Sequence, residues 1–108
     1  DHRITLAAVL AAARPLAGSS VREIYACEIP SATEWGCGQL SGVFAPNSFV
    51  DISATLERKL AALRRYVTEL PAFPHPRSPE AVRALAQVRG AQAGVTAAEA
   101  FVLVRSVR

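Results

Sequence analysis

The chain has 108 residues, the length of one small domain, and 51% of them are hydrophobic while 19% are charged. This balance excludes an intrinsically disordered chain, because there is ample apolar surface to bury. The formal net charge is +3 at pH 7, and the basic residues are scattered, so no nucleic-acid-binding stripe is indicated. They cluster only at 58–59 and 64–65, on the polar side of one helical pattern, where we expect a solvated face.

Cys27 and Cys37 are too few for a disulfide scaffold and lack the Cys-x-x-Cys spacing of a metal site. Two reduced thiols in a cytoplasmic protein are the expected state, with a single bridge as the alternative. The longest apolar region, 6–13, is followed by arginine and proline and is too short to cross a membrane, and no signal peptide is evident. The chain opens on aspartate and contains no methionine, which predicts a fragment or a trimmed chain.

The first predicted elements are a helix over 4–13 and a strand over 21–29. In the helix, apolar residues recur at i, i+3, i+4 and i+7, and its alanines would allow close packing against a sheet. The strand alternates its side chains between two faces and is rich in β-branched and aromatic residues. Residues 31–48 show no period and contain Trp35 among glycines, which predicts a long loop, and 49–52 is expected to be a brief strand.

The strongest helical pattern covers 54–70. Its leucines and a valine recur at helical spacing, charged residues fill the other side, and Ser53 is the expected N-cap. Four prolines between 71 and 79 then predict a rigid connector. This connector carries His75 and Arg77.

A third helix is expected to begin after Ser78, which would cap it ahead of a proline and a glutamate, and to end at Gly90. Residues 97–107 could form a terminal strand or a short helix, of which we favour the strand. The order is therefore helix, strand, long loop, short strand, helix, helix and strand. This order suits the edge of an α/β sheet.

The spacing of residues alone indicates few candidate catalytic residues. His2 and His75 are the two histidines, neither lies in a metal-spaced pair, and a lone histidine is more often structural. Asp1 precedes His2 at the start of a predicted helix, an arrangement that suits the edge of a metal site, because a carboxylate commonly orients an imidazole ligand. A zinc site needs at least three protein ligands, so His2 would be one of several.

The chain opens on Asp-His-Arg, directly ahead of the first predicted helix, and distinctive blocks follow it along the sequence. They resemble, in the same order, the PIG-L/LmbE-like N-acetylglucosaminyl deacetylases, whose His-Pro-Asp-His-Arg motif ends with a histidine that begins a helix. The resemblance spans nearly the whole chain, in the blocks 1–3, 28–35, 44–52, 75–78, 89–90, 94 and 98–101.

The resemblance implies that residues 1–108 are the C-terminal portion of a Rossmann-like α/β deacetylase domain, with an incomplete sheet and flanking helices. It implies one divalent metal, usually Zn²⁺, with His2 as a ligand. Asp1 corresponds to a catalytic-site carboxylate that accompanies this ligand without binding the metal. The family's other two ligands and its general base belong to an earlier motif that these residues do not include.

The implied reaction is zinc-dependent hydrolysis of the N-acetyl group of an acetylated amino sugar, which gives acetate and a free amino sugar. The implied setting is a cytoplasmic enzyme, without nucleic acid or membrane insertion, that assembles as a homo-oligomer such as a trimer or hexamer. The 108 residues alone are expected to be inactive and to bind zinc weakly. The alternative function is a small α/β interaction module without catalytic activity.

Several residues keep two interpretations at this stage. His75 and Arg77 are candidate substrate-binding residues at a proline-locked entrance, or they form an exposed lead-in to the third helix. Glu34 and Trp35 would contact sugar, because aromatic faces stack on pyranose rings, or Trp35 covers core or an oligomer contact. Glu99, in an apolar tail, is expected to make a structural ion pair with a partner such as an arginine.

Overall fold

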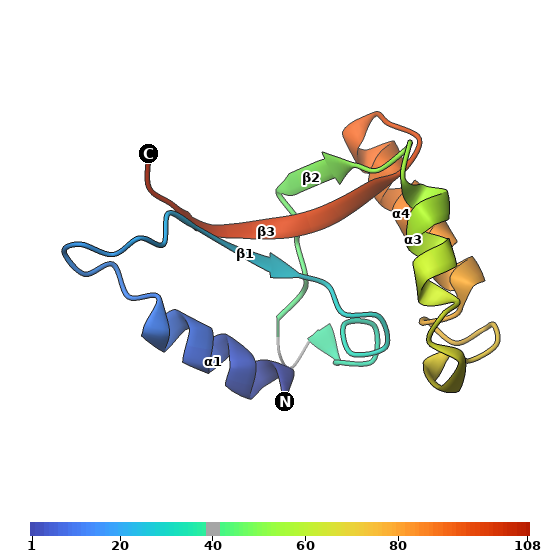
Figure 1. The fold of residues 1–108 in the computed structure, drawn as a ribbon, viewed down its shortest axis with the longest axis horizontal. Helices are drawn as coiled ribbons and strands as arrows, with labels where there is room; N and C mark the ends of the chain where they lie inside the picture. The colour runs from blue at the N-terminus through green and yellow to red at the C-terminus, as the bar shows by residue number, and fades with distance from the viewer. Residues whose placement is uncertain (39–41) are drawn as a thin grey trace.

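The protein has a three-stranded sheet, two helices packed at one end of it and a first helix that lies apart from that pair, described here by a computed structural model over residues 1–38 and 42–108 (Figure 1). This is the expected α/β class, and the elements follow in the expected order. They are α1 (His2–Ala12), β1 (Glu23–Cys27), β2 (Ser48–Asp51), α3 (Leu56–Leu63), the 3₁₀ turn η1 (Val67–Glu69), α4 (Pro79–Ala93) and β3 (Ala98–Ser106).

The sheet has the order β1-β3-β2, and both pairings are antiparallel. The last strand therefore lies in the middle: Glu23 of β1 pairs with Ser106, and Asp51 of β2 pairs with Ala98 at the opposite end of β3. The expected strands 21–29, 49–52 and 97–107 are all confirmed, each with slightly different bounds. Within the expected loop 31–48, residues 39–41 lie outside the described part of the chain.

The main core lies where α3 and α4 pack together at one end of the sheet (Figure 1). Leu60 of α3 is completely buried there, as its place in the predicted apolar stripe requires. α4 contacts both β2 and β3, so the sheet end and the two helices bury one apolar cluster. Its buried members are Ile52, Leu56, Leu60, Val82, Ala86 and Ala97.

The helix predicted over 54–70 is shorter than expected, because α3 ends at Leu63. Tyr66 leaves the helical region with ψ 62°, and only a 3₁₀ turn follows it. The prediction that Ser53 caps this helix is wrong: Thr55 occupies the N-cap position. The Ser53 hydroxyl instead donates to the Asp51 carboxylate at 2.5 Å and accepts from the Ala97 amide at 3.3 Å, so it links β2 to the start of β3.

The start of α4 agrees with the prediction and its end does not. The buried Ser78 side chain caps α4 by accepting a hydrogen bond from the Ala81 amide at 3.1 Å. The helix runs past Gly90 and ends at Gly94, which takes the left-handed conformation with φ 75°. Gly90 has a packing role, because a Cβ there would lie 2.6 Å from the Val95 carbonyl oxygen.

The first helix forms nearly as predicted, but it does not pack against the sheet. Every residue of α1 is exposed, and α1 contacts no other helix or strand of the described chain. Figure 1 shows it lying away from α3 and α4. Its end is tied to the sheet by Arg105 of β3, whose guanidinium donates to the carbonyl of Ala13. Its apolar side chains Ile4, Leu6, Val9 and Leu10 remain exposed.

Candidate functional site

The predicted metal-site residues lie at the exposed start of α1. Asp1 is the N-cap residue, and its carbonyl oxygen accepts from the Thr5 amide at 2.9 Å, while its carboxylate makes no capping bond. His2 is the first helical residue, as the resemblance implies, and its side chain is exposed. Among the described contacts, no hydrogen bond joins Asp1 to the His2 imidazole, so the proposed orienting interaction is not formed here.

The described residues do not by themselves fit a zinc site. Over 1–38 and 42–108, no three His, Cys, Asp or Glu side chains come together in a metal-binding group. Structural and catalytic zinc sites both take at least three protein ligands. His2 therefore has no set of companions within this part of the chain.

The clearest meeting of candidate residues is between Trp35 and His75. Their ring centroids are 5.0 Å apart and their planes are inclined at 78°, an edge-to-face contact between segments 40 positions apart in sequence. Trp35 remains 61% exposed, so it does not cover the core. The structure thus joins two candidates that the sequence left in separate segments.

The connector around His75 also positions Arg77. The Nδ1 atom of His75 accepts a hydrogen bond from the Arg77 backbone amide at 3.1 Å. The Arg77 guanidinium lies 3.8 Å from the Glu69 carboxylate, and both side chains are largely exposed. No hydrogen bond, ion pair or ring contact in the described part of the chain joins Asp1 or His2 to this group.

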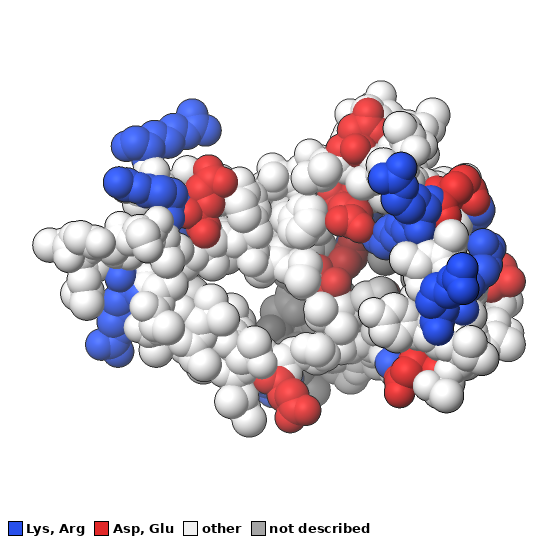
Figure 2. All heavy atoms as spheres, viewed as in Figure 1, with Lys and Arg blue, Asp and Glu red and all other residues white. Residues whose placement is uncertain are grey.

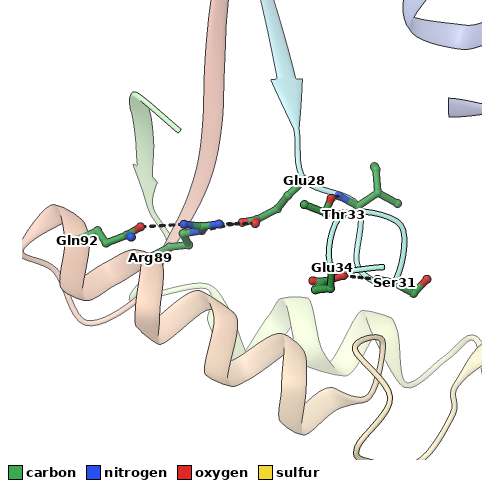
Figure 3. Close-up of polar contacts among 7 residues, drawn as sticks. Glu28, Ser31, Thr33, Glu34, Arg89 and Gln92 are labelled. Atoms are coloured by element: carbon green, nitrogen blue, oxygen red, sulfur yellow. Dashed lines mark hydrogen bonds and ion pairs between the residues drawn. The ribbon is translucent and has the colours of Figure 1, made fainter. Parts of the chain in front are cut away.

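The turn that carries Trp35 is held by its own hydrogen bonds (Figure 3). The Glu34 carboxylate accepts from the Ser31 amide at 2.6 Å, and the Thr33 hydroxyl accepts from the Ile29 amide at 2.7 Å. Ser31 has φ 75°, a left-handed conformation that non-glycine residues seldom adopt. These contacts fix the backbone that leads to Trp35, whose side chain then projects toward solvent.

Figure 3 also shows an ion pair that the sequence analysis missed, between Glu28 after β1 and Arg89 in α4. Two hydrogen bonds of 2.9 and 2.6 Å join the guanidinium to the two carboxylate oxygens. The Arg89 side chain is only 14% exposed and the Glu28 side chain only 12%. The hydrogen bonds that the guanidinium donates to Glu28 raise the pKa of Arg89. Arg89 also donates to Gln92 at 3.0 Å and lies 5.6 Å from the centroid of the Phe44 ring.

No local spacing signals this pair, because 61 positions separate its members. The available signal was that Glu28, Phe44 and Arg89 each stand in a block that carries the family resemblance. The blocks indicate the family but name no partner for any of their residues. In the structure the three side chains form one cluster where the end of β1, the 31–48 region and α4 meet.

Glu99 makes the expected ion pair. Its partner is a lysine and not an arginine, and the pair lies at the surface. Its carboxylate lies 2.5 Å from the Lys59 ammonium, with both side chains about two-fifths exposed. This pair borders a groove of about 490 Å³ between the sheet, α3 and α4. Its floor is apolar, with Leu63, Val82 and Phe101 among the lining residues, and none of Asp1, His2, Trp35, His75 and Arg77 lines it.

The charged surface over α3 and α4 mixes both signs (Figure 2). Arg83 of α4 is paired with Glu57 of α3 through hydrogen bonds of 2.5 and 2.9 Å. Arg58, Arg64 and Arg65 are exposed, as expected of a solvated helix face. No helix in the described residues has the length and apolar character needed to cross a membrane.

A comparison of the chain with known protein families, curated proteins and solved structures finds no match.

Proposed function

We propose that the chain is the C-terminal portion of a Rossmann-like, zinc-dependent N-deacetylase domain acting on an acetylated amino sugar in the cytoplasm. One observation carries the proposal: four of the blocks that bear the family resemblance, 28–35, 44–52, 75–78 and 89–90, contact one another although they are far apart in sequence. Glu28 pairs with Arg89, the Arg89 guanidinium lies near the Phe44 ring, and Trp35 contacts His75. Shared contacts among these blocks are expected if the blocks surround one site.

In this proposal the residues divide between a metal side and a substrate side. His2 supplies one zinc ligand from the exposed start of α1, with Asp1 beside it, and the remaining ligands and the general base come from outside residues 1–108. His75 and Arg77 stand on the substrate side. The reaction adds water across the amide bond: the C–N bond breaks, acetate leaves and the sugar amine takes up the proton.

The test is an assay of the full gene product that contains these residues, with N-acetylglucosamine and its conjugates as substrates. Acetate and primary amine should appear in equal amounts, and removal of metal by a chelator should stop the reaction. His2→Ala should lower kcat/KM at least about 100-fold, since even residues that only support metal ligands contribute 10- to 100-fold. Thr5→Ala, which changes an exposed residue of the same helix outside the block 1–3, is the matched control. A product that is inactive on every acetylated sugar, or an unaffected His2→Ala variant, would refute the proposal.

The second candidate, a non-catalytic interaction module, is favoured by the surface of α1. Ile4 is 73% exposed, and Leu6, Val9 and Leu10 are also exposed, so a whole apolar helix face lacks a partner in the described chain. Such a face is typical of a helix that docks on another protein surface. A Leu6→Glu/Leu10→Glu variant of the full gene product separates the two candidates. The interaction module is supported if the unaltered product has no deacetylase activity and the variant loses a partner chain that the unaltered product binds.

A further inference from the structure

The surface of the chain is larger than a compact monomer of its mass requires. A folded monomer of 11.5 kDa exposes about 5,800 Å², whereas this chain exposes 7777 Å². Its radius of gyration is 15.6 Å, compared with about 13 Å for a compact domain of this length. The excess of about 2,000 Å² is of the size that a stable protein interface buries. The fold therefore leaves room for a partner that covers a substantial part of its surface.

One apolar surface without a partner lies on α1. Leu6, Val9 and Leu10 stand at i, i+3 and i+4, so they share one face of the helix, and each is between 42% and 49% exposed. No charged residue lies between Arg3 and Arg14, and α1 contacts no other helix or strand of the described chain. The surface formed by Leu6, Val9 and Leu10, here called the α1 face, can therefore be buried without taking a charge out of water.

The groove of about 490 Å³ between the sheet, α3 and α4 is a second apolar surface of this kind. Its charged lining residues are all held in ion pairs, which involve Glu28, Lys59 and Glu99. A charged partner would find no unpaired opposite charge among them, whereas an uncharged helix face would disturb none of these pairs. The apolar lining residues include Leu63, Val82, Leu85, Ala100 and Phe101.

The α1 face and the groove match each other in chemistry. A helix with apolar side chains at i, i+3 and i+4 is a common occupant of an apolar groove. Within one chain the two stay apart: α1 makes no contact with α3 or α4, and Arg105 ties its C-terminal end to the part of β3 that lies away from them (Figure 1). Every copy of the chain carries both surfaces, so two copies can each receive the α1 of the other around a two-fold axis.

We propose that two copies of the chain form a dimer in which the α1 face of each copy lies in the groove of the other. The contact is made twice, so that about 1,000 Å² of each chain is covered, which is enough for a stable interface. It also covers Tyr66, which lines the groove and is 66% exposed in the single chain. This two-fold exchange differs from the trimer or hexamer that the family resemblance implies, and it does not depend on the proposed hydrolysis.

Sedimentation velocity of the 108-residue chain tests the assembly. The chain should sediment as a dimer, at twice its mass of 11.5 kDa, with a Kd on the order of 1 µM. Leu10→Glu places a charge on the α1 face, and Ala62→Arg places one in the groove, because Ala62 is exposed and lines it. Each change should raise the Kd at least about 30-fold, as expected for the loss of a central interface contact.

The chain offers a matched control for each variant. Ala8→Glu adds the same charge on the side of α1 opposite the α1 face. Ala61→Arg changes the exposed neighbour of Ala62, which does not line the groove. Both control variants should remain dimers, and circular dichroism should show that all four variants keep their fold.

A mixture of the two interface variants separates this exchange from any other dimer. The Leu10→Glu chain keeps its groove and the Ala62→Arg chain keeps its α1 face, so the mixture restores one of the two contacts. It should therefore associate more tightly than either variant alone. A mixture that associates no more tightly, or a dimer that Ala62→Arg leaves unchanged, overturns the proposal.

The size of the unaltered protein gives the remaining outcomes. A 108-residue chain that stays monomeric, or that forms a trimer or hexamer, overturns the exchange. So does a full gene product that is monomeric while the 108-residue chain is a dimer, because residues outside 1–108 would then cover these surfaces. Release of acetate is measured separately, so the proposed function and the dimer can fail independently.

Discussion

The ion pair between Glu28 and Arg89 should contribute more to stability than any other charged pair described. Arg89→Ala deletes the two hydrogen bonds to Glu28, of 2.9 and 2.6 Å, together with the bond to Gln92. It removes the partner of a Glu28 side chain that is only 12% exposed in the intact protein. A hydrogen bond to a charged group contributes about 1.5 to 3 kcal/mol, and the loss of one partner of a fully buried pair costs about 3 to 5 kcal/mol. The pair is nearly but not fully buried, so we expect a loss of about 2 to 3 kcal/mol.

The assay is chemical and thermal denaturation followed by circular dichroism, with the tryptophan as a second probe. A loss of this size should lower Tm by on the order of 10 °C in a domain of about 100 residues. A double-mutant cycle with Glu28→Gln should give a coupling free energy of about 1.5 kcal/mol or more.

Arg83→Ala is the matched control, because Arg83 also lies in α4 and also binds a glutamate through two hydrogen bonds, but at the surface. Its effect should be clearly smaller and should shrink further in 1 M salt, which screens exposed charges. Equal losses for Arg89→Ala and Arg83→Ala would refute the argument that burial gives the Glu28 pair its weight.

Other predictions concern Gly90 and the N-cap of α4, the stability of the protein in acid and the binding of zinc. Gly90→Ala should destabilise the protein by about 1 to 3 kcal/mol, because the new Cβ meets backbone atoms at 2.6 to 2.8 Å; a raised Tm, as for an ordinary helical Gly→Ala change, would contradict this. Ser78→Ala should cost about 1 kcal/mol in urea denaturation through the lost cap, and no loss would contradict it. Hydrogen bonds from the Ser53 side chain and then its backbone lower the pKa of Asp51 from 3.8. The stability that these hydrogen bonds contribute is complete above pH 3.8 and is lost as the pH falls through the lower pKa of Asp51 in the folded protein. Asp51→Asn should therefore reduce the loss of stability in acid, and an unchanged loss would contradict this. Calorimetry should find zinc binding weaker than micromolar for the 108 residues alone, and stoichiometric sub-micromolar binding would contradict the assignment of His2 as one ligand among several.

The sequence predicted the secondary structure well where the signal is local. Ser78 followed by proline and glutamate is such a signal, and the structure places the start of α4 there. The end of α4 is different, because Gly90 and Gly94 are both plausible stops by composition. Only the close approach of the chain at Val95 shows that Gly90 serves packing and that Gly94 takes the left-handed turn.

Long-range contacts were harder to predict, because no short spacing encodes them. The apolar periodicity of α1 predicted a helix correctly, but it could not say whether a surface would be present to receive that helix. The contact between Trp35 and His75 depends on how a turn and a proline-rich connector meet across the fold. Each residue was a candidate alone, and the pairing became visible only in three dimensions.

The position of β3 has a consequence for the newly made chain. β1 and β2 both pair only with β3 in the described sheet, and Glu23 finds its partner at Ser106. Within residues 1–108, both early strands therefore have no strand partner until β3 has been translated. Contacts this distant in sequence slow folding and leave strand edges open to other chains. A premature stop codon just before β3 would accordingly remove every strand pairing of the described sheet, although residues 1–97 had already been made.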